Sequence, residues 1–158
     1  MKFLDIDEQK LRQEKLQQFI RQHGLDGLLV SSNANLYYVS GAVYAGYAYV
    51  PAEGNMLYLV RRPVGIEHPQ VVYIRQPEQI LDVLESVGIA KPARLALELD
   101  RLPYNMAKRL QAAFNVDDIF NGSPILSQSR SVKTPFEIEP LRQSGIRHSN
   151  SYQRIDSV

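Results

Sequence analysis

GLDGLLVSSNANLYYVSG, residues 24–41, is the stretch of sequence that decides the fold. Residues 25–30 are predicted to form a buried strand, because the last three are apolar and follow one another without a polar interruption. Ser32 or Asn33 can then cap a short helix that ends at Gly41, since glycine takes the left-handed conformation that commonly follows a helix. This strand and helix begin an alternation of elements that runs through most of the chain.

The residues before this stretch predict an amphipathic helix. Asp7 is the expected N-cap, and Glu8 follows in the first turn, where the helix dipole favours a carboxylate. Ile6 and Leu11 are spaced so that they can form a hydrophobic staple across that cap. Gly24 is expected to end the helix.

After residue 41, short apolar runs alternate with helical patterns. Strands are predicted at residues 47–50, 56–60, 71–74, 95–99 and 116–120, and helices at 77–87, at 103–114 and from Ser123 onward. The turn Pro-Ala-Glu-Gly-Asn at residues 51–55 joins the first two of these strands into a β-hairpin. The pattern predicts an α/β fold over residues 1–130, a three-layer domain in which a mixed sheet is covered by helices on both faces.

The tail, residues 131–158, does not fit that domain. Thr134 to Glu137 reads as a capping box with proline at the first helical position, which is a specific signal for a helix start. Pro140 removes one helical hydrogen bond and is expected to kink or delay this helix. The helix carries a stripe that needs a partner surface, formed by Ile138, Leu141, Gly145, His148, Tyr152 and Ile155. We therefore expect a linker and a first helix that lead into a missing C-terminal domain.

Composition excludes several classes of function. The chain has 158 residues, the size of one domain, and its 18 Lys and Arg against 17 Asp and Glu give a net charge of +1. Such a balance argues against a nucleic-acid partner, which would need a basic face. The N-terminus is not a signal peptide, and no apolar run is long enough for a membrane span, so no membrane partner is expected. Cysteine is absent, which excludes disulfides and thiolate metal sites and suits a cytoplasmic location.

No catalytic residue and no metal site can be assigned from the motifs of the sequence. Phosphate-binding glycine loops and the G-x-S-x-G nucleophile motif are missing. The three histidines, His23, His68 and His148, lie far apart, and none has a second ligand at metal-binding spacing. His23 is expected to cap the end of the first helix. Asp117 and Asp118 are adjacent in a predicted strand, so their side chains would point to opposite faces.

Two features stay open between a functional and a structural interpretation. Glu98 and Asp100 follow a predicted strand, at the sheet edge where α/β proteins place ligands, but such a pair can equally anchor a loop through backbone hydrogen bonds. Five of the nine tyrosines lie within thirteen residues: Tyr37, Tyr38, Tyr44, Tyr47 and Tyr49. Such tyrosines can line a pocket or an interface, or they can be ordinary core and strand residues.

Three blocks of the sequence, in the same order, resemble the N-terminal domain of the creatinase/prolidase family. The first is GLDGLLVSSNANLYYVSG at residues 24–41, and the second is LELDRLPYNMAKRLQAAF at residues 97–114. The third, SRSVKTPFEIEPLRQSG at residues 129–145, resembles the stretch that joins that domain to the catalytic one. Together the blocks span almost the whole chain, and this makes the resemblance specific.

The resemblance implies Xaa-Pro metallopeptidases, namely aminopeptidase P, prolidase and their relatives. Their catalytic half, of the pita-bread fold, holds two divalent metal ions, commonly Mn, Co or Zn, on two Asp, one His and two Glu. The first two aspartates of that family lie eleven positions apart, and no Asp of this chain has another Asp eleven residues later. The metal site is therefore expected beyond Val158, and this fragment alone is expected not to be an enzyme.

The resemblance also implies a role for the fragment. In the family the N-terminal domain covers the mouth of the catalytic domain, often that of the partner subunit in a homodimer, and limits access of proline-containing peptides. By this carry-over Tyr44 and Tyr47, and with less weight Asn35, Tyr37 and Tyr38, are the residues expected near the substrate. The alternatives are the N-terminal domain of a creatinase-type hydrolase, or a non-catalytic protein-binding module on the same fold.

Overall fold

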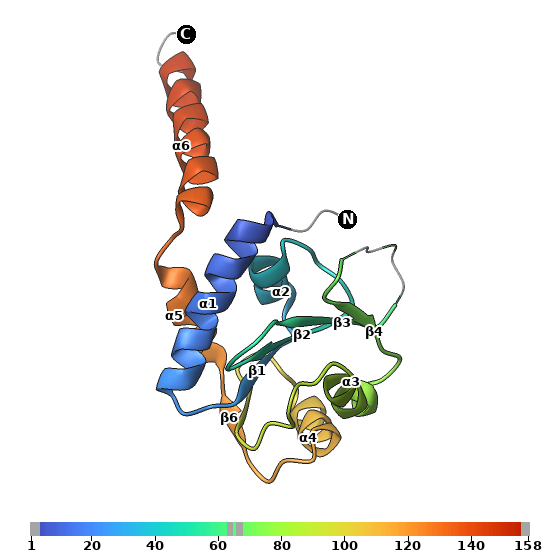
Figure 1. Ribbon diagram of the computed structural model, residues 1–158. Coiled ribbons are helices and arrows are strands. Elements are labelled where there is room, and N and C mark those ends of the chain that lie inside the picture. Colours follow the sequence, from blue (N-terminus) through green and yellow to red (C-terminus); the bar gives the residue numbers. More distant parts are fainter. Residues whose placement is uncertain (1–3, 63–64, 66–67, 156–158) are drawn as a thin grey trace.

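The computed structural model describes residues 4–62, 65 and 68–155, and in this part of the chain six strands form a single sheet (Figure 1). The strands are β1 (Gly27–Val30), β2 (Gly46–Pro51), β3 (Leu57–Val60), β4 (Val71–Tyr73), β5 (Leu95–Leu97) and β6 (Ile119–Asn121), in the spatial order β4-β3-β2-β1-β5-β6. The pairs β1–β2 and β2–β3 are antiparallel, and the other three pairs are parallel. The prediction of a mixed sheet with a β-hairpin is confirmed.

Helices cover both faces of this sheet, so the three-layer arrangement is also confirmed. The α-helices are α1 (Ile6–Gln22), α2 (Asn33–Ser40), α3 (Ile80–Ser86, after a 3-10 turn η1 at Pro77–Gln79), α4 (Tyr104–Ala113), α5 (Ser123–Ser131) and α6 (Pro135–Ile155). Apolar side chains of α1, α2 and α5 pack on one face of the sheet, and those of α3 and α4 pack on the other. Figure 1 shows α6 extending away from these layers.

The two halves of the core follow from the alternation of side chains along the strands. In β1, Leu28 and Val30 belong to the cluster under α1, α2 and α5, whereas Leu29 belongs to the cluster under α3 and α4. All three are fully buried. A strand covered on both faces needs apolar residues at every position, and this is why the strand at the start of the deciding stretch could be recognised.

The first helix begins differently from the prediction. Asp5, rather than Asp7, is the N-cap residue of α1, and its side chain accepts a hydrogen bond from the backbone N–H of Asp7 (3.0 Å). Ile6 is thus the first helical residue and does not precede the cap. Ile6 and Leu11 are 51% and 46% exposed, so the expected hydrophobic staple is not formed. The sequence offers two capping aspartates, and pattern alone does not choose between them.

The last strand is shorter than the prediction. β6 begins at Ile119, so Asp117 and Asp118 precede the strand and are exposed. The reasoning from alternating strand faces therefore does not apply to these two carboxylates. The register explains the boundary, because Leu95, the first residue of β5, is opposite Ile119 and leaves no partner for the residues before it.

The helix in the tail begins where the capping box predicts. The backbone N–H of Thr134 donates to Oε2 of Glu137 (3.0 Å), and the N–H of Glu137 donates back to Oγ1 of Thr134 (3.2 Å). The helix starts at Pro135 and continues through Pro140, which therefore neither delays its start nor ends it. The side chains from residue 138 to residue 152 are all exposed, as expected for a stripe without a partner surface.

Gly24 and Gly41 follow helices with φ of +62° and +78°, and they differ in what surrounds them. A Cβ at Gly24 would meet open space, but a Cβ at Gly41 would lie 2.7 Å from the backbone nitrogen of Leu4. We expect Gly24→Ala to lower the free energy of unfolding by about 1 kcal/mol, the cost of a left-handed alanine. Gly41→Ala should lower it by about 1 kcal/mol more, because Leu4 must also move.

Urea unfolding of both glycine variants and the parent chain measures these two costs. Gly145→Ala is the control, since Gly145 lies in α6 with no atom within 4 Å of an added Cβ, and alanine favours helix there. Equal destabilisation by Gly24→Ala and Gly41→Ala would contradict the tight contact between Gly41 and Leu4.

Candidate functional site

The carboxyl ends of β1 and β5 meet around one buried carboxylate. Glu98 comes directly after β5, and its side chain is fully buried. Oε2 accepts hydrogen bonds from the backbone N–H of Ser31, from Oγ of Ser31 (3.1 Å) and from the N–H of Ser32 (2.8 Å). Oε1 accepts from Oγ of Ser32 (2.7 Å) and from Nδ2 of Asn35 (2.6 Å). Glu98 therefore joins β5 to the loop after β1 and to α2, and the loop-anchoring interpretation is confirmed for this residue.

The same contacts explain how α2 begins. Ser32 is the N-cap residue of α2, but its hydroxyl makes no hydrogen bond to the first turn of the helix. It donates to Glu98 instead, which places a negative charge beside the N-terminus of α2, where the helix dipole favours it. A carboxylate distant in sequence thus adds a favourable charge at the start of α2.

These donors also set the pKa of Glu98. Burial alone would raise the pKa, but the N–H groups of Ser31 and Ser32 and the side chains of Asn35 and Ser32 favour the charged form. The donors outweigh the burial, and the pKa of Glu98 lies below its ordinary value. The carboxylate is therefore held ionised, which suits an anchor and does not suit a general acid at neutral pH.

Polar contacts continue from this carboxylate to the end of α5. Asn35 donates to Glu98 through Nδ2 and accepts from Nη1 of Arg130 through Oδ1 (3.0 Å). The hydroxyl of Tyr38 lies 3.0 Å from Oγ of Ser129, one residue earlier in α5. Two predicted residues, Asn35 and Tyr38, therefore connect α2 to the segment that leads into α6.

A cavity of about 390 Å³ lies where α2, α5 and the first turns of α6 meet. Its apolar lining comes from Tyr37, Phe136 and Leu141, which are all more than half exposed. Its charged lining consists of the cations Arg12, Arg130 and Lys133 and the carboxylate of Glu137. Aromatic surface beside cationic groups can bind a ligand or a protein segment that is partly apolar and carries a carboxylate. This is the candidate functional site, and it contains Tyr37 and Tyr38 among the residues expected near a substrate.

Tyr44 and Tyr47 lie elsewhere, on opposite faces of the sheet. Both are 5% exposed. The hydroxyl of Tyr44 donates to the carbonyl oxygen of Tyr47 (3.3 Å), and the hydroxyl of Tyr47 lies 3.8 Å from Sδ of Met106 on α4. Burial raises the pKa of both phenols. The structure thus gives these tyrosines packing contacts and does not bring them together with Tyr37, and their place near a substrate stays a prediction.

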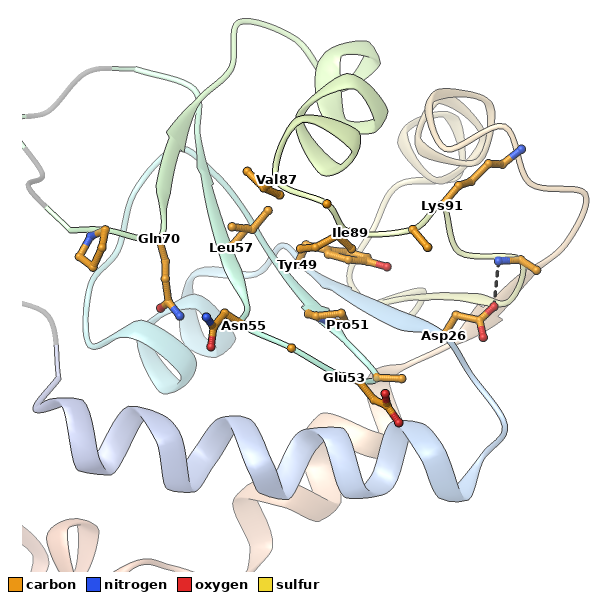
Figure 2. A pocket seen from close by; sticks show the side chains of 16 residues that line it. Asp26, Tyr49, Pro51, Glu53, Asn55, Leu57, Gln70, Val87, Ile89 and Lys91 are labelled. Carbon is orange, nitrogen blue, oxygen red and sulfur yellow. Dashed lines mark hydrogen bonds between the residues drawn. The ribbon is translucent and has the colours of Figure 1, made fainter.

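A larger cavity of about 940 Å³ lies at the end of the strands that is opposite Glu98, between the β2–β3 turn and the segment before β5 (Figure 2). Val87, Ile89 and Leu57 line it, with Tyr49 beneath them and Lys91 nearby. This cavity could not be predicted from the sequence, because the contributing segments lie far apart in the chain and share no motif.

Of the two carboxylates that line this larger cavity, Asp26 and Glu53, the first is engaged in hydrogen bonds. Oδ2 of Asp26 accepts hydrogen bonds from the backbone N–H groups of Ala93 and Arg94, both at 2.8 Å. These contacts join the segment before β1 to the segment before β5. Asp26 therefore fixes the parallel pairing at this edge and does not point to a reaction.

Two of the three histidines, His23 and His68, have structural surroundings, and His148 is exposed on α6. His23 is the C-cap residue of α1, and its Nδ1 lies 2.8 Å from the carbonyl oxygen of Phe19, which confirms the predicted capping role. The ring of His68 meets the ring of Tyr58 edge-on at 5.3 Å, and burial lowers its pKa. Within residues 4–62, 65 and 68–155, no three His, Cys, Asp or Glu side chains are grouped so that they could hold a metal ion. The described residues therefore do not fit a two-metal site.

None of the helices in the described ranges is long and apolar enough to cross a membrane.

Residues 12–132 match the Creatinase/Prolidase N-terminal domain family. The match covers more than half of the chain, and the chain belongs to this family. The chain is 22% identical over 150 residues to the Xaa-Pro dipeptidase of Pyrococcus horikoshii, and 24% identical over 141 residues to that of Pyrococcus furiosus. The alignments cover 89% and 85% of this chain but only 40% and 39% of the relatives. The chain thus spans well under half the length of these curated relatives.

Solved structures share the fold. The Xaa-Pro dipeptidase from Bacillus anthracis matches with a TM-score of 0.67 at 18% identity, over 91% of this chain and 43% of that one. The N-terminal domain of a cytoplasmic peptidase from Mycobacterium tuberculosis matches with a TM-score of 0.62 at 21% identity, over 75% of this chain and 98% of that one. The second comparison is with an isolated N-terminal domain, so the common fold is that of the N-terminal part.

Replacement of Glu98 tests whether the buried carboxylate holds the site together. Glu98→Gln removes the charge and turns an NH₂ group toward donors, so we expect the free energy of unfolding to fall by about 2–3 kcal/mol. Asp100→Asn is the matched control, because Asp100 is exposed and accepts only from Nδ2 of Asn121 (2.9 Å) in the described part of the chain. The control should stay within about 0.5 kcal/mol of the parent in urea unfolding. Similar midpoints for the parent and Glu98→Gln would contradict the anchoring role.

The lowered pKa of Glu98 predicts a dependence of stability on pH. As the pH falls, the unfolded chain takes up a proton at this carboxyl first, because its pKa is lower in the folded state. Its contribution is therefore complete well above the ordinary glutamate value of about 4.3 and is lost as the pH falls through the folded pKa. Urea unfolding of the parent and Glu98→Gln from neutral to acidic pH should show their difference shrinking in acid. A difference that stays constant would contradict this linkage.

Proposed function

We propose that this chain is the N-terminal domain of an Xaa-Pro dipeptidase or a close relative, whose catalytic domain hydrolyses the peptide bond before proline. The observation that carries the proposal is the family match over residues 12–132, together with two Xaa-Pro dipeptidases that align with the chain over 40% and 39% of their own length. The two divalent metal ions of such a reaction would be held outside this chain, since the described residues do not fit them. The relative described as a cytoplasmic peptidase supports a cytoplasmic location.

The domain's own contribution would be access control and not bond cleavage. Glu98 is held ionised as an anchor, and the exposed groups at the candidate site include Tyr37, Arg130 and Lys133. An aromatic wall beside a reaction centre excludes water and long peptides without supplying an acid or a base. A cationic group beside it suits the terminal carboxylate of a short peptide. In a homodimer this wall would lie over the catalytic domain of the partner subunit.

The first test is the activity of the full-length protein. It is purified, loaded separately with Mn²⁺, Co²⁺ or Zn²⁺, and assayed with Ala-Pro, Ala-Ala, a longer Ala-Pro peptide and creatine. Turnover of Ala-Pro but not Ala-Ala is expected. Turnover of creatine instead would identify a creatinase-type hydrolase. Absence of turnover with every metal would favour a protein-binding module and overturn the proposal.

Replacement of Tyr37 tests access control in that enzyme. Tyr37→Ala removes an exposed ring from the wall of the site, so KM for Ala-Pro should rise by about tenfold, which corresponds to roughly 1.4 kcal/mol. The preference for dipeptides over longer peptides should relax as well. Tyr104→Ala is the control, because Tyr104 is an even more exposed tyrosine on the opposite side of the sheet. Equal kinetics of the parent and the Tyr37 variant would contradict the assignment of the wall.

A further inference from the structure

The segment between α5 and α6 is bound to the body of the domain from α1. Lys15 donates from Nζ to the carbonyl oxygens of Ser129 (2.5 Å) and Val132 (2.8 Å), and so binds the end of α5. Two residues later, Oγ1 of Thr134 donates to Oε1 of Glu8 (2.7 Å). These contacts join residues more than a hundred positions apart in the chain. The connection is therefore a fixed corner and not a free linker.

At the centre of this corner lies a buried ion pair. Oε1 of Glu8 is 2.7 Å from Nε of Arg12, and the side chains of both residues are less than a tenth exposed. Thr134 is 6% exposed. A buried ion pair is costly unless further hydrogen bonds satisfy its charges. Here Thr134 adds a second donor to Glu8, and Nη1 of Arg12 donates to the carbonyl oxygen of Tyr38 (2.6 Å).

Arg12 also contacts the first turn of α6. Its guanidinium carbon lies 4.7 Å from the ring centroid of Tyr38 on α2 and 5.9 Å from that of Phe136 on α6. A guanidinium is planar, so it can stack on aromatic faces while its edge makes hydrogen bonds. A lysine ammonium is a compact charge and does not stack in this way. Arg12 thus contacts α2 and α6 from its position on α1.

Thr134 connects Glu8 on α1 directly to the N-terminus of α6. Its hydroxyl donates to Glu8 and accepts from the N–H of Glu137, so the N-cap of α6 is itself the point of attachment. Beyond this first turn, every side chain from residue 138 to residue 152 is exposed. The direction of α6 relative to the sheet therefore depends on the contacts at its first turn.

We propose that Glu8, Arg12, Thr134 and Phe136 form an orienting clamp that holds α6 in one direction relative to the sheet. The clamp fixes where the exposed stripe of α6 points, and with it the placement of any domain that packs on that stripe. On the basis of the proposed function, Glu8 and Arg12 are positioning residues for the catalytic domain, and Arg12 also lines the cavity of the candidate site.

The absence of cysteine from the chain makes the direction of α6 directly measurable. Gln18→Cys on α1 and Gln143→Cys on α6 provide two exposed positions for spin labels. Double electron–electron resonance spectroscopy then gives the distribution of distances between the two labels. The 158-residue chain is expected to show one narrow distribution. Arg12→Met should make that distribution about twofold wider, because the first turn of α6 then acts as a hinge.

Two further variants keep the test decisive. Glu8→Gln with Arg12→Met removes both charges, so no unpaired buried carboxylate prevents folding, and it should widen the distribution equally. Arg109→Met is the matched control, since Arg109 forms an exposed ion pair with Glu78 (2.6 Å) away from α6, and it should leave the distribution unchanged. An unchanged distribution in the folded double variant would overturn the proposal.

The distance measurement is independent of enzyme activity, so the clamp and the proposed function can fail separately. If the full-length protein cleaves Ala-Pro, the double variant should lower kcat about tenfold while the metal content stays unchanged. Wider distances with unchanged kcat would overturn the positioning role and leave only the orienting contact. Wider distances in a protein without peptidase activity would overturn the proposed function alone.

Discussion

The hydrogen bonds to the buried carboxylate of Glu98 are the interaction on which the structure at the C-terminal ends of β1 and β5 depends. Burial of this carboxylate takes a charge out of water, and the cost is met because donors from Ser31, Ser32 and Asn35 surround both oxygens. Those donors belong to a strand end and to a helix start. The side chain therefore fixes β5, the β1–α2 loop and the first turn of α2 relative to one another, and through Asn35 it reaches Arg130 on α5.

The elements of the fold were largely predictable because their signals are local. Six apolar runs became six strands of the described sheet, and Gly24 and Gly41 follow helices as expected. The predicted element boundaries are wrong where two nearby residues can each cap a helix, or where the pairing with a neighbouring strand sets the first residue of a strand. Asp5 and Asp7 can each cap α1, and β6 begins only where Leu95 pairs with Ile119. Boundaries of this kind depend on tertiary pairing, which periodicity does not record.

The candidate site was less predictable, because it is made of contacts between distant segments. The anchoring role of Glu98 could be proposed from its place after a strand, but its donors lie more than sixty residues earlier. The tyrosine-rich stretch does not form one group in space, since its residues divide among an exposed helix position, the core under α1 and the core under α4. Nothing in the local sequence links Glu8 to Thr134, and only the packing of α1 against α5 brings them together.

The distribution of polar groups argues for a domain that works by holding surfaces in place. The buried charged side chains, Glu8, Arg12 and Glu98, each have at least one hydrogen-bond partner in another segment of the fold. The pKa of Glu98 lies below its ordinary value because of its hydrogen-bond donors, so this carboxylate is ionised at neutral pH and is suited to an anchoring role and not to acid–base work. Accessible groups, among them Tyr37, Arg130 and Lys133, surround the start of α6, the helix with the exposed stripe. A domain that controls access to a reaction centre in another domain needs buried residues that fix its elements and exposed residues that contact the ligand.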